Sequence, residues 1–560
     1  MKKDNSYRIG QGMFTNILKK SSSVLMAGLL GLFISSAANA AEFVIFHTSD
    51  VHGAINAHDD PTSKVQNKPL MGGYAVLQNL INRTKEKAEY KGARFMYFDS
   101  GDFFQGTPIV DKTKGGVMID LLNKLGVNGT TLGNHEFDYS YENLQKQMKN
   151  KKFPVLCCNA FDKRTGELLS FATEYAVFAH DGIKLGVVGV DTPETKWISF
   201  EKNVENIEFK DPVPIVTELA KKLKKNGCDF VIMLSHLGLN ADIEFLKKAE
   251  GVDMILGGHT HVVKQDFVYA GPNNTPIVHS GCSCEHASVV TLDIDGISKP
   301  KMSIKSVPLY EKDIGEDGFI KNLSEDYLKD LRAEMTKVLC INKVNLYRGV
   351  PGGNSPAGYL VGDAMRRVGK ADVAFLNFGG CRRSIYKGNV TVEDMFLVQP
   401  FENAIEIVKM TGVELKHIYE LSLSVPTVKI DKDDKQSALE QFNCVIDGLR
   451  LEVGAGYGFL IPSGVKVYCD ISKPSMHRII KMTDMDGKEI DDKKTYKVAF
   501  NDFLVDGGDG FAILKTFPNK EKTDILVRDA VIRYIEELKV IDKVPENRVF
   551  NSALSEEFLE

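Results

Sequence analysis

Short apolar runs alternate with longer amphipathic or charged stretches from Phe43 to about Leu292, and this alternation constrains the fold most. The runs have the length and apolar content of buried strands and comprise Phe43–Phe46, Phe95–Phe98, Gly129–Leu132, Val155–Leu156, Leu185–Val190, Phe230–Leu234, Met254–Leu256 and Ile277–Val278. Between them, helices are expected over Tyr74–Lys87, Gly116–Leu125, Tyr141–Lys149 and Pro214–Lys225. Strands and helices that alternate in this way predict a layered α/β domain.

Residues of metal-binding type follow five of the predicted strands. The five stretches are Asp50-Val51-His52, Gly101-Asp102, Gly133-Asn134-His135-Glu136-Phe137-Asp138, Ser235-His236 and Gly257-Gly258-His259-Thr260-His261. A single histidine or aspartate after a strand is more often structural. Because open α/β sheets gather ligands at the C-terminal ends of their strands, five such stretches predict one shared site.

The side chains of these stretches suit a pair of divalent metal ions. Asp, His and Asn offer hard or borderline donors, which suit Mn, Zn, Fe or Co. A two-metal hydrolase of phosphate esters uses its ions to activate water and to hold the phosphoryl oxygens. Two cations about 3.5–4 Å apart repel each other, so a shared carboxylate is needed, and Asp102 is the candidate. His135 is then free to face the phosphoryl group, and Asp138 can accept its other ring N–H.

The first forty residues have the pattern of a signal peptide. Five lysines and arginines precede an apolar run, Val24–Ile34, and Ala38-Asn39-Ala40 follows as a cleavage site. The run is shorter than the ~20 residues of a membrane span, so we expect cleavage after Ala40, export to the periplasm or the extracellular space, and no span in the mature chain. The net charge of −5 gives no reason to expect a nucleic-acid polymer as partner.

Nine cysteines are present, and an odd count leaves at least one thiol unpaired. Cys282 and Cys284 with His286 could form a soft-metal site. They lack the spacing and second pair of a structural zinc site, which favours packing or a disulfide and leaves the pairing open.

A length of 560 residues predicts at least two domains. Apolar residues at helical spacing over Phe319–Val338 predict a linking helix, and Asp524–Leu538 predicts a final helix. The expected organisation is a signal peptide over residues 1–40, a catalytic domain over 41–317, a linker over 318–340 and a second domain over 341–553.

The second half contains three runs with aromatic residues, Asn377–Arg382, Pro400–Asn403 and Phe503–Phe511, and the first and third are rich in glycine. A single phenylalanine is core by default, but glycines beside an arginine and an aspartate give exposed turns that let backbone approach a ligand. Aromatic pairs form a slot for a nucleobase because every base has a π-face.

The motifs HTSDVHG, DSGDFFQGTP, GNHEFDY, LSHLG and GGHTH resemble those of the calcineurin-like metallophosphoesterases. Nearly the whole mature chain resembles the exported 5′-nucleotidase family, which includes UDP-sugar hydrolases and 2′,3′-cyclic-nucleotide phosphodiesterases. The resemblance implies a four-layer α/β/β/α sandwich followed by a smaller α/β substrate-binding domain. It implies one ion held by Asp50, His52, Asp102 and His261, and a second held by Asp102, Asn134, His236 and His259. His135 and Asp138 resemble the family's catalytic dyad.

In the second domain the resemblance implies that Phe401 and Phe503 sandwich the base, Asn377 bonds its edge and Asp509 accepts from the ribose. Arg382 would approach the phosphates or the sugar. Phe378 and Cys381 depart from the family pattern, as does the stretch 354–359, so a second arginine contact from Arg366, Arg367 or Arg383 is not implied. Relatives turn one domain against the other, which makes the Phe319–Val338 helix the expected hinge.

The expected function is hydrolysis of nucleoside 5′-monophosphates by in-line attack of a metal-bound hydroxide. The alternatives are a UDP-sugar hydrolase or 2′,3′-cyclic-nucleotide phosphodiesterase, and, from another class, an inactive nucleoside-binding surface protein. The presence of every proposed metal ligand weighs against the last of these. The oligomeric state is left open.

Overall fold

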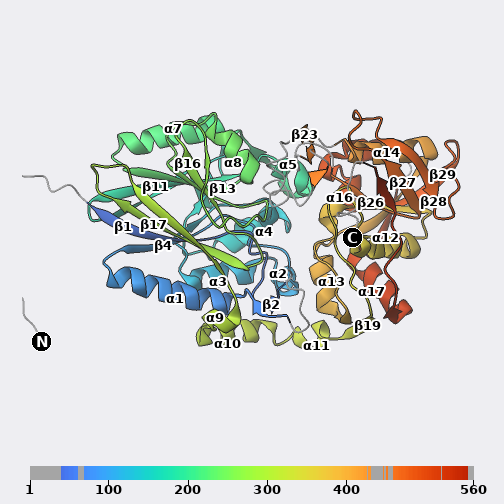
Figure 1. The fold of residues 1–560 in the computed structure, drawn as a ribbon, viewed down its shortest axis with the longest axis horizontal. Helices are drawn as coiled ribbons and strands as arrows, with labels where there is room; N and C mark the ends of the chain where they lie inside the picture. The colour runs from blue at the N-terminus through green and yellow to red at the C-terminus, as the bar shows by residue number, and fades with distance from the viewer. Residues whose placement is uncertain are drawn as a thin grey trace, which may run out of the picture. The chain divides into compact units, whose positions relative to one another are not determined.

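Two β-sheets of the N-terminal domain lie face to face between helices in the computed structural model (Figure 1). The first sheet has the strand order β18 (Lys301–Pro308), β17 (His286–Ile294), β1 (Ala41–Thr48), β4 (Arg94–Asp99), β5 (Gly129–Thr130), β6 (Val155–Leu156) and β9 (Ala172–Thr173). The second has the order β10 (Tyr175–His180), β11 (Ile183–Asp191), β13 (Phe230–His236), β14 (Met254–Gly257), β16 (Thr275–His279) and β15 (Val268–Ala270). All eight predicted runs are therefore strands, and β1, β4, β5 and β6 run parallel.

Side-chain alternation along the strands produces four layers. On β1, Phe43 and Ile45 belong to the core between the sheets, whereas Phe46 packs in the core that contains α1 (Tyr74–Tyr90) and α3 (Gly116–Leu125). On β13, Ile232 packs between the sheets, and Val231 packs with α7 (Pro212–Lys225) and α8 (Leu239–Leu246). Successive strand residues point to opposite faces, so the central strands β1 and β13 are buried on both sides. The predicted α/β/β/α sandwich is confirmed.

The helices of this domain begin and end where local residues can satisfy free backbone groups. α7 begins two residues before the predicted Pro214, because the Asp211 side chain accepts from the Val213 N–H and Pro212 occupies the first turn. α3 has the predicted bounds and ends at Gly126, whose φ of 73° suits glycine. α4 (Tyr141–Met148) begins after Ser140, which accepts from the Asn143 N–H.

The prediction of one helix over Phe319–Val338 is wrong. Helix α10 covers Gly318–Leu328, a separate turn α11 covers Arg332–Met335, and strand β19 (Val338–Asn342) follows. Between the two helices, the Leu331 N–H bonds to the Leu328 carbonyl three residues back, not four, which tightens the chain. The boundaries at residues 317 and 340 stay a prediction.

The C-terminal domain is built on a five-stranded mixed sheet. Its strand order is β26 (Leu460–Ser463), β20 (Val373–Asn377), β29 (Thr495–Asn501), β22 (Ala404–Thr411) and β30 (Lys520–Leu526). Helices α12 (Pro356–Val368) and α17 (Val527–Leu538) pack in one core, and α14 (Gly412–Ser422) packs in another. The final helix starts after the predicted Asp524, because Asp524 belongs to β30.

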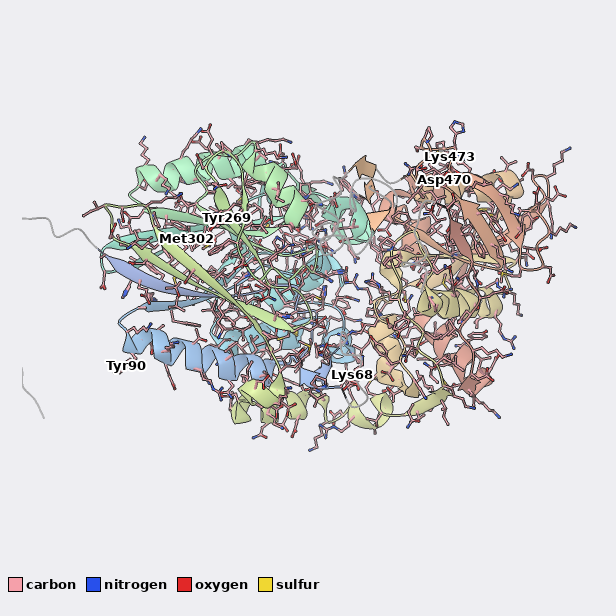
Figure 2. The ribbon with its side chains drawn as sticks, viewed as in Figure 1. Lys68, Tyr90, Tyr269, Met302, Asp470 and Lys473 are labelled. Carbon is pink, nitrogen blue, oxygen red and sulfur yellow. The ribbon has the colours of Figure 1, made fainter. Side chains whose placement is uncertain are left out.

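The structure describes residues 40–60, 68–424, 427–429, 445–446, 449–451, 458–518 and 520–552, which lie in one compact unit. The predicted signal segment before Ala40 and the charged run Asp431–Lys435 fall outside these ranges. Within the ranges, no helix combines the length and apolarity needed to cross a bilayer. The eight cysteines they contain are all unpaired, and seven of them, including Cys284, are buried. Tyr90 and Tyr269 remain at the surface of the domain (Figure 2).

Candidate metal centre and adjoining cavity

The predicted metal ligands follow strand ends that meet at one edge of the two sheets. Asp50 and His52 come after β1, Asp102 after β4, and Asn134 opens the short helix η1 (Asn134–Phe137) after β5. His236 is the last residue of β13, and β14 is followed by His259 and His261. Parallel strands bring their C-terminal ends together, as the sequence analysis expected.

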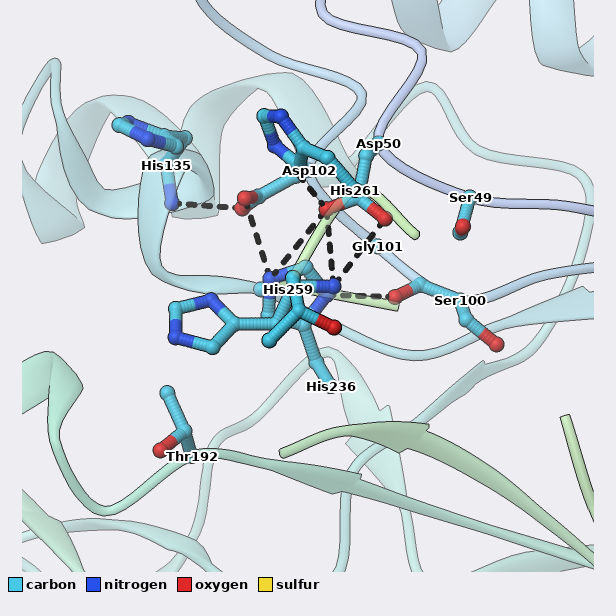
Figure 3. Close-up of polar contacts among 12 residues, drawn as sticks. Ser49, Asp50, Ser100, Gly101, Asp102, His135, Thr192, His236, His259 and His261 are labelled. Atoms are coloured by element: carbon cyan, nitrogen blue, oxygen red, sulfur yellow. Dashed lines mark hydrogen bonds and ion pairs between the residues drawn. The ribbon is translucent and has the colours of Figure 1, made fainter. Parts of the chain in front are cut away.

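The ligand atoms converge around Asp102 and Asp50 (Figure 3). The Asp102 Oδ2 atom lies 3.0 Å from His236 Nε2 and 3.9 Å from His52 Nε2. The Asp50 Oδ1 atom lies 3.6 Å from His261 Nε2. Three groups have ligand atoms within 4.8 Å of one another, namely Asp50/His52/His261, Asp102/His236/His259 and His52/Asp102/His135. Asp102 belongs to two of these groups, as does His52.

Five of the seven predicted ligands have left-handed backbone, with φ of 51° at Asp50, 45° at His52, 56° at Asp102, 78° at His259 and 59° at His261. Such conformations cost on the order of 1–3 kcal/mol each and persist where the surroundings hold them. Asparagine, aspartate and histidine tolerate this region best. These backbone conformations direct the five side chains toward one another, and they lower the local stability of the loops.

Close packing fixes the turn that carries Asn134. A Cβ atom at Gly133 would lie 2.3 Å from Asp102 Oδ1 and 2.6 Å from His236 Nε2. Only glycine lets this turn approach the ligand cluster.

The donor set fits divalent ions. The Nε2 atoms of His52 and His261 are 3.0 Å apart, and the buried Asn134 Oδ1 has no hydrogen-bond partner within the described ranges. An unpaired buried acceptor of this kind is costly unless a ligand satisfies it. Burial lowers the pKa of His259 to about 3, so its imidazole is neutral, as metal coordination requires.

Asp102 is held as a carboxylate. Burial would raise its pKa, but His236 and then His135 outweigh burial and hold the pKa well below its usual value. The pKa of His236 is raised well above its usual value: burial opposes the rise, and Asp102 outweighs it. His236 also contacts the Ser100 carbonyl through Nδ1, at 2.6 Å.

His135 and Asp138 form the predicted pair. The His135 Nδ1 atom lies 2.7 Å from Asp138 Oδ2, and the His135 backbone N–H donates to Asp102 Oδ1. Burial lowers the pKa of His135, but Asp138 and Asp102 together outweigh it and raise the pKa above its usual value. This pair leaves Nε2 as the ring nitrogen that can face a ligand.

Glu136 is a residue of this site that the sequence analysis did not single out. Its buried Oε1 accepts from the N–H groups of Phe103 and Phe104, and its Oε2 accepts from those of Asp102 and Gly133. One side chain thus ties the loop after β4 to the turn after β5. Its place inside the GNHEFDY motif was visible in the sequence, but its partners were not.

A cavity of about 520 Å³ adjoins the candidate metal ligands, and it is lined by residues of both domains. From the N-terminal domain it includes Asp102, Asn134, His135, Asp138, His259 and His261. From the C-terminal domain it includes all five predicted substrate residues, Asn377, Arg382, Phe401, Phe503 and Asp509. Residues more than 200 positions apart in the chain therefore share one cavity.

The predicted substrate residues make definite contacts in the cavity. Asn377 donates from Nδ2 to Asp509 Oδ2 at 2.8 Å. The Phe401 ring stacks on the ring of His135, with centroids 6.0 Å apart, and the Arg382 guanidinium lies 5.9 Å from the centroid of Phe401. Phe503 meets Phe200 edge to face with centroids 5.7 Å apart. Phe401 thus lies between the Arg382 side chain and the ring of His135 in its contacts.

The second arginine of the cavity is Arg348, which the sequence analysis missed. It lies over the Phe378 ring at 4.4 Å and donates from Nε to the Cys381 carbonyl at 2.6 Å. Burial lowers its pKa to about 10, and Arg382 adds to the effect. Arg366 and Arg367 instead bond to Ser463 and Glu537.

Comparisons with known proteins agree with this architecture. The calcineurin-like phosphoesterase model matches residues 43–263, and the 5′-nucleotidase C-terminal domain model matches residues 336–516. The chain is 26% identical to the 5′-nucleotidase of Rattus norvegicus over 562 residues, which covers 92% of each chain. It is 26% identical to the snake venom 5′-nucleotidase of Gloydius brevicauda, over 93% of this chain and 90% of the other. The crystal structure of the 5′-nucleotidase precursor from Thermus thermophilus superposes with a TM-score of 0.79 at 25% identity, covering 92% of this chain and 100% of that one.

The fold and the site define the protein as a metallophosphoesterase, a phosphoric ester hydrolase of a class that uses divalent metal ions. More narrowly, the chain belongs to the 5′-nucleotidase family, in which a calcineurin-like phosphoesterase domain is followed by a 5′-nucleotidase C-terminal domain.

Proposed function

We propose that this protein removes phosphate from nucleoside 5′-monophosphates. The observation that carries the proposal is the single cavity that is lined both by the metal-ligand cluster and by the aromatic, amide and arginine groups of the C-terminal domain. A small phosphate ester would need only the first set. An aromatic and polar wall beside the cluster suits a substrate with a base and a sugar.

We further propose that Asp50, His52, Asp102 and His261 hold one ion, and that Asp102, Asn134, His236 and His259 hold the other. When bound, such ions activate water and place positive charge at the phosphoryl oxygens. The carboxylate of Asp102, common to both sets, would offset the repulsion between two cations held there.

The chain's own residues position the ester and balance its charge. With Nδ1 held by Asp138, His135 presents Nε2 to the phosphoryl and leaving-group oxygens and stabilises the charge that develops there. Arg382 and Arg348 line the cavity and favour an anionic substrate. Asn377 and Asp509 bind the base edge and the ribose, and Phe401 and Phe503 provide the aromatic faces.

We infer that the mature chain is exported and acts on extracellular or periplasmic nucleotides. The basic and apolar pattern of residues 1–40 supports this, as does similarity to a snake venom 5′-nucleotidase. Sequencing the N-terminus of the protein recovered outside the cytoplasm would test it, with Ala41 expected as the first residue.

The test of function is a comparison of kcat/KM for AMP, UDP-glucose and 2′,3′-cyclic AMP. We expect AMP to be the best of the three. A kcat/KM for UDP-glucose or the cyclic nucleotide far above that for AMP would reject the proposal. Metal analysis of the purified protein tests the two-ion centre separately, since an inactive binding protein would contain no transition metal.

A further inference from the structure

The segment after β11 supplies an aromatic wall to the cavity from the N-terminal domain. It contains the short helices α5 (Thr195–Ile198) and α6 (Glu201–Val204), with Ser199 and Phe200 between them. Trp197 and Phe200 line the same cavity as the C-terminal residues assigned to the substrate. The Trp197 side chain is 42% exposed, which leaves surface for a ligand.

On its substrate side, this segment contacts Phe503. The rings of Phe200 and Phe503 meet edge to face at an interplanar angle of 83°. The Phe503 ring also packs closely against Gly508, where an added Cβ atom would lie 2.4 Å from the ring. Glu201, next to Phe200, pairs with Lys515 of the C-terminal domain. Phe200 therefore holds the orientation of the Phe503 ring from one side.

On its other side, the same segment is bonded to the turn that carries the catalytic pair. The buried Ser199 donates from Oγ to the Asn134 carbonyl at 3.1 Å. The buried Asn203 donates from Nδ2 to the Asp138 carbonyl at 2.8 Å. Two side chains that flank Phe200 are thus fixed to the backbone of Asn134 and Asp138, so the position of the Phe200 ring relative to His135 is fixed as well.

We propose that Phe200 is a specificity-determining residue, which holds Phe503 and forms, with Trp197, a wall for the nucleoside that the N-terminal domain contributes. The inference rests on the proposed function. As a consequence, the position of the base relative to the turn that carries His135 depends on the hydrogen bonds of Ser199 and Asn203. A phosphate ester without a base makes no use of this wall.

The test compares Phe200→Ala with Phe200→Leu and the unaltered protein on AMP and on p-nitrophenyl phosphate. We expect Phe200→Ala to raise KM for AMP about 3- to 10-fold, the size of a lost edge-to-face aromatic contact, with kcat nearly unchanged. Phe200→Leu keeps most of the side-chain volume, so its KM for AMP should lie between those of Phe200→Ala and the unaltered protein. The p-nitrophenyl phosphate constants should not change. Phe161→Ala removes a half-buried ring outside the cavity, and it serves as the matched control.

Binding provides a second readout that does not depend on turnover. Trp197 is the single tryptophan of the chain, so its fluorescence should change as adenosine is titrated into the full-length protein. The Kd for adenosine should rise in Phe200→Ala by the same factor as KM. If Phe200→Ala leaves both the Kd for adenosine and the KM for AMP unchanged, the inference is wrong. It is also wrong if the variant loses the same activity on AMP and on p-nitrophenyl phosphate. Either result leaves the proposed function standing. If the unaltered protein cleaves p-nitrophenyl phosphate but neither binds adenosine nor cleaves AMP, the proposed function fails, and the inference fails with it.

Discussion

Replacing Glu136 by glutamine should destabilise the N-terminal domain. The carboxylate is buried, and its two oxygens accept four backbone N–H groups at 2.7–2.9 Å. Glutamine has nearly the same shape but carries one NH₂ group in place of an oxygen. Whichever way the amide turns, two of the four backbone N–H groups will face a donor.

The expected loss of stability follows from these two backbone N–H groups without an acceptor. A buried donor left without an acceptor costs about 1–3 kcal/mol, so two of them cost about 2–6 kcal/mol. The net stability of a domain is only about 5–15 kcal/mol, so the effect is large enough to measure and leaves a folded protein in most of that range. The loop that carries Asp102 should also lose its tie to the turn that carries Asn134.

The assay is urea unfolding of chelator-treated protein, followed by the fluorescence of Trp197, which lies in the N-terminal domain. Removal of metal keeps ligand binding from adding to the apparent stability. The matched control is Glu142→Gln, because the Glu142 side chain is 65% exposed on the next helix and should shift stability by less than about 0.5 kcal/mol. A shift of the same small size in Glu136→Gln would refute the reasoning.

Three further substitutions test the assigned roles. Asp102→Asn should abolish turnover, measured as kcat, and should lower metal affinity, measured by metal analysis. The loss of affinity should exceed the roughly 10–100-fold that is typical when a residue behind a metal ligand is changed. Full metal occupancy in this variant would exclude a bridging role. His135→Ala should keep its metals and lower kcat by about 10²-fold or more, and an unchanged kcat would exclude it from catalysis. Phe503→Ala should raise KM for AMP and spare p-nitrophenyl phosphate, whereas equal damage to both would argue against a base slot.

The layered fold was predictable because it depends on local patterns. Buried parallel strands are apolar throughout, and amphipathic helices between them leave a period of 3.6 residues in the sequence. The eight predicted strands and α3 follow from these patterns alone. The break between α10 and α11 did not follow, because Leu323 and Tyr327 in α10 and Met335 in α11 pack in the core and keep helical spacing across the break.

The nature of the metal-binding side chains was also determined by the sequence, since five stretches after strands carry donors of one chemical type. Their convergence depends on pairings such as β1 with β4 and β13 with β14, which bring residues from Asp50 to His261 to one edge. The sequence could not show that Glu136 binds four amides, because backbone donors carry no residue identity.

Only the tertiary structure shows that Trp197, Phe200 and Arg348 line the cavity. Trp197, Phe200 and Arg348 have no motif around them, and a single aromatic or arginine is core or surface by default. Local spacing records which face of a strand or helix is buried, because that choice repeats every few residues. A contact such as that of Phe200 with Phe503 joins residues about three hundred positions apart and repeats nowhere, so only the folded chain reveals it.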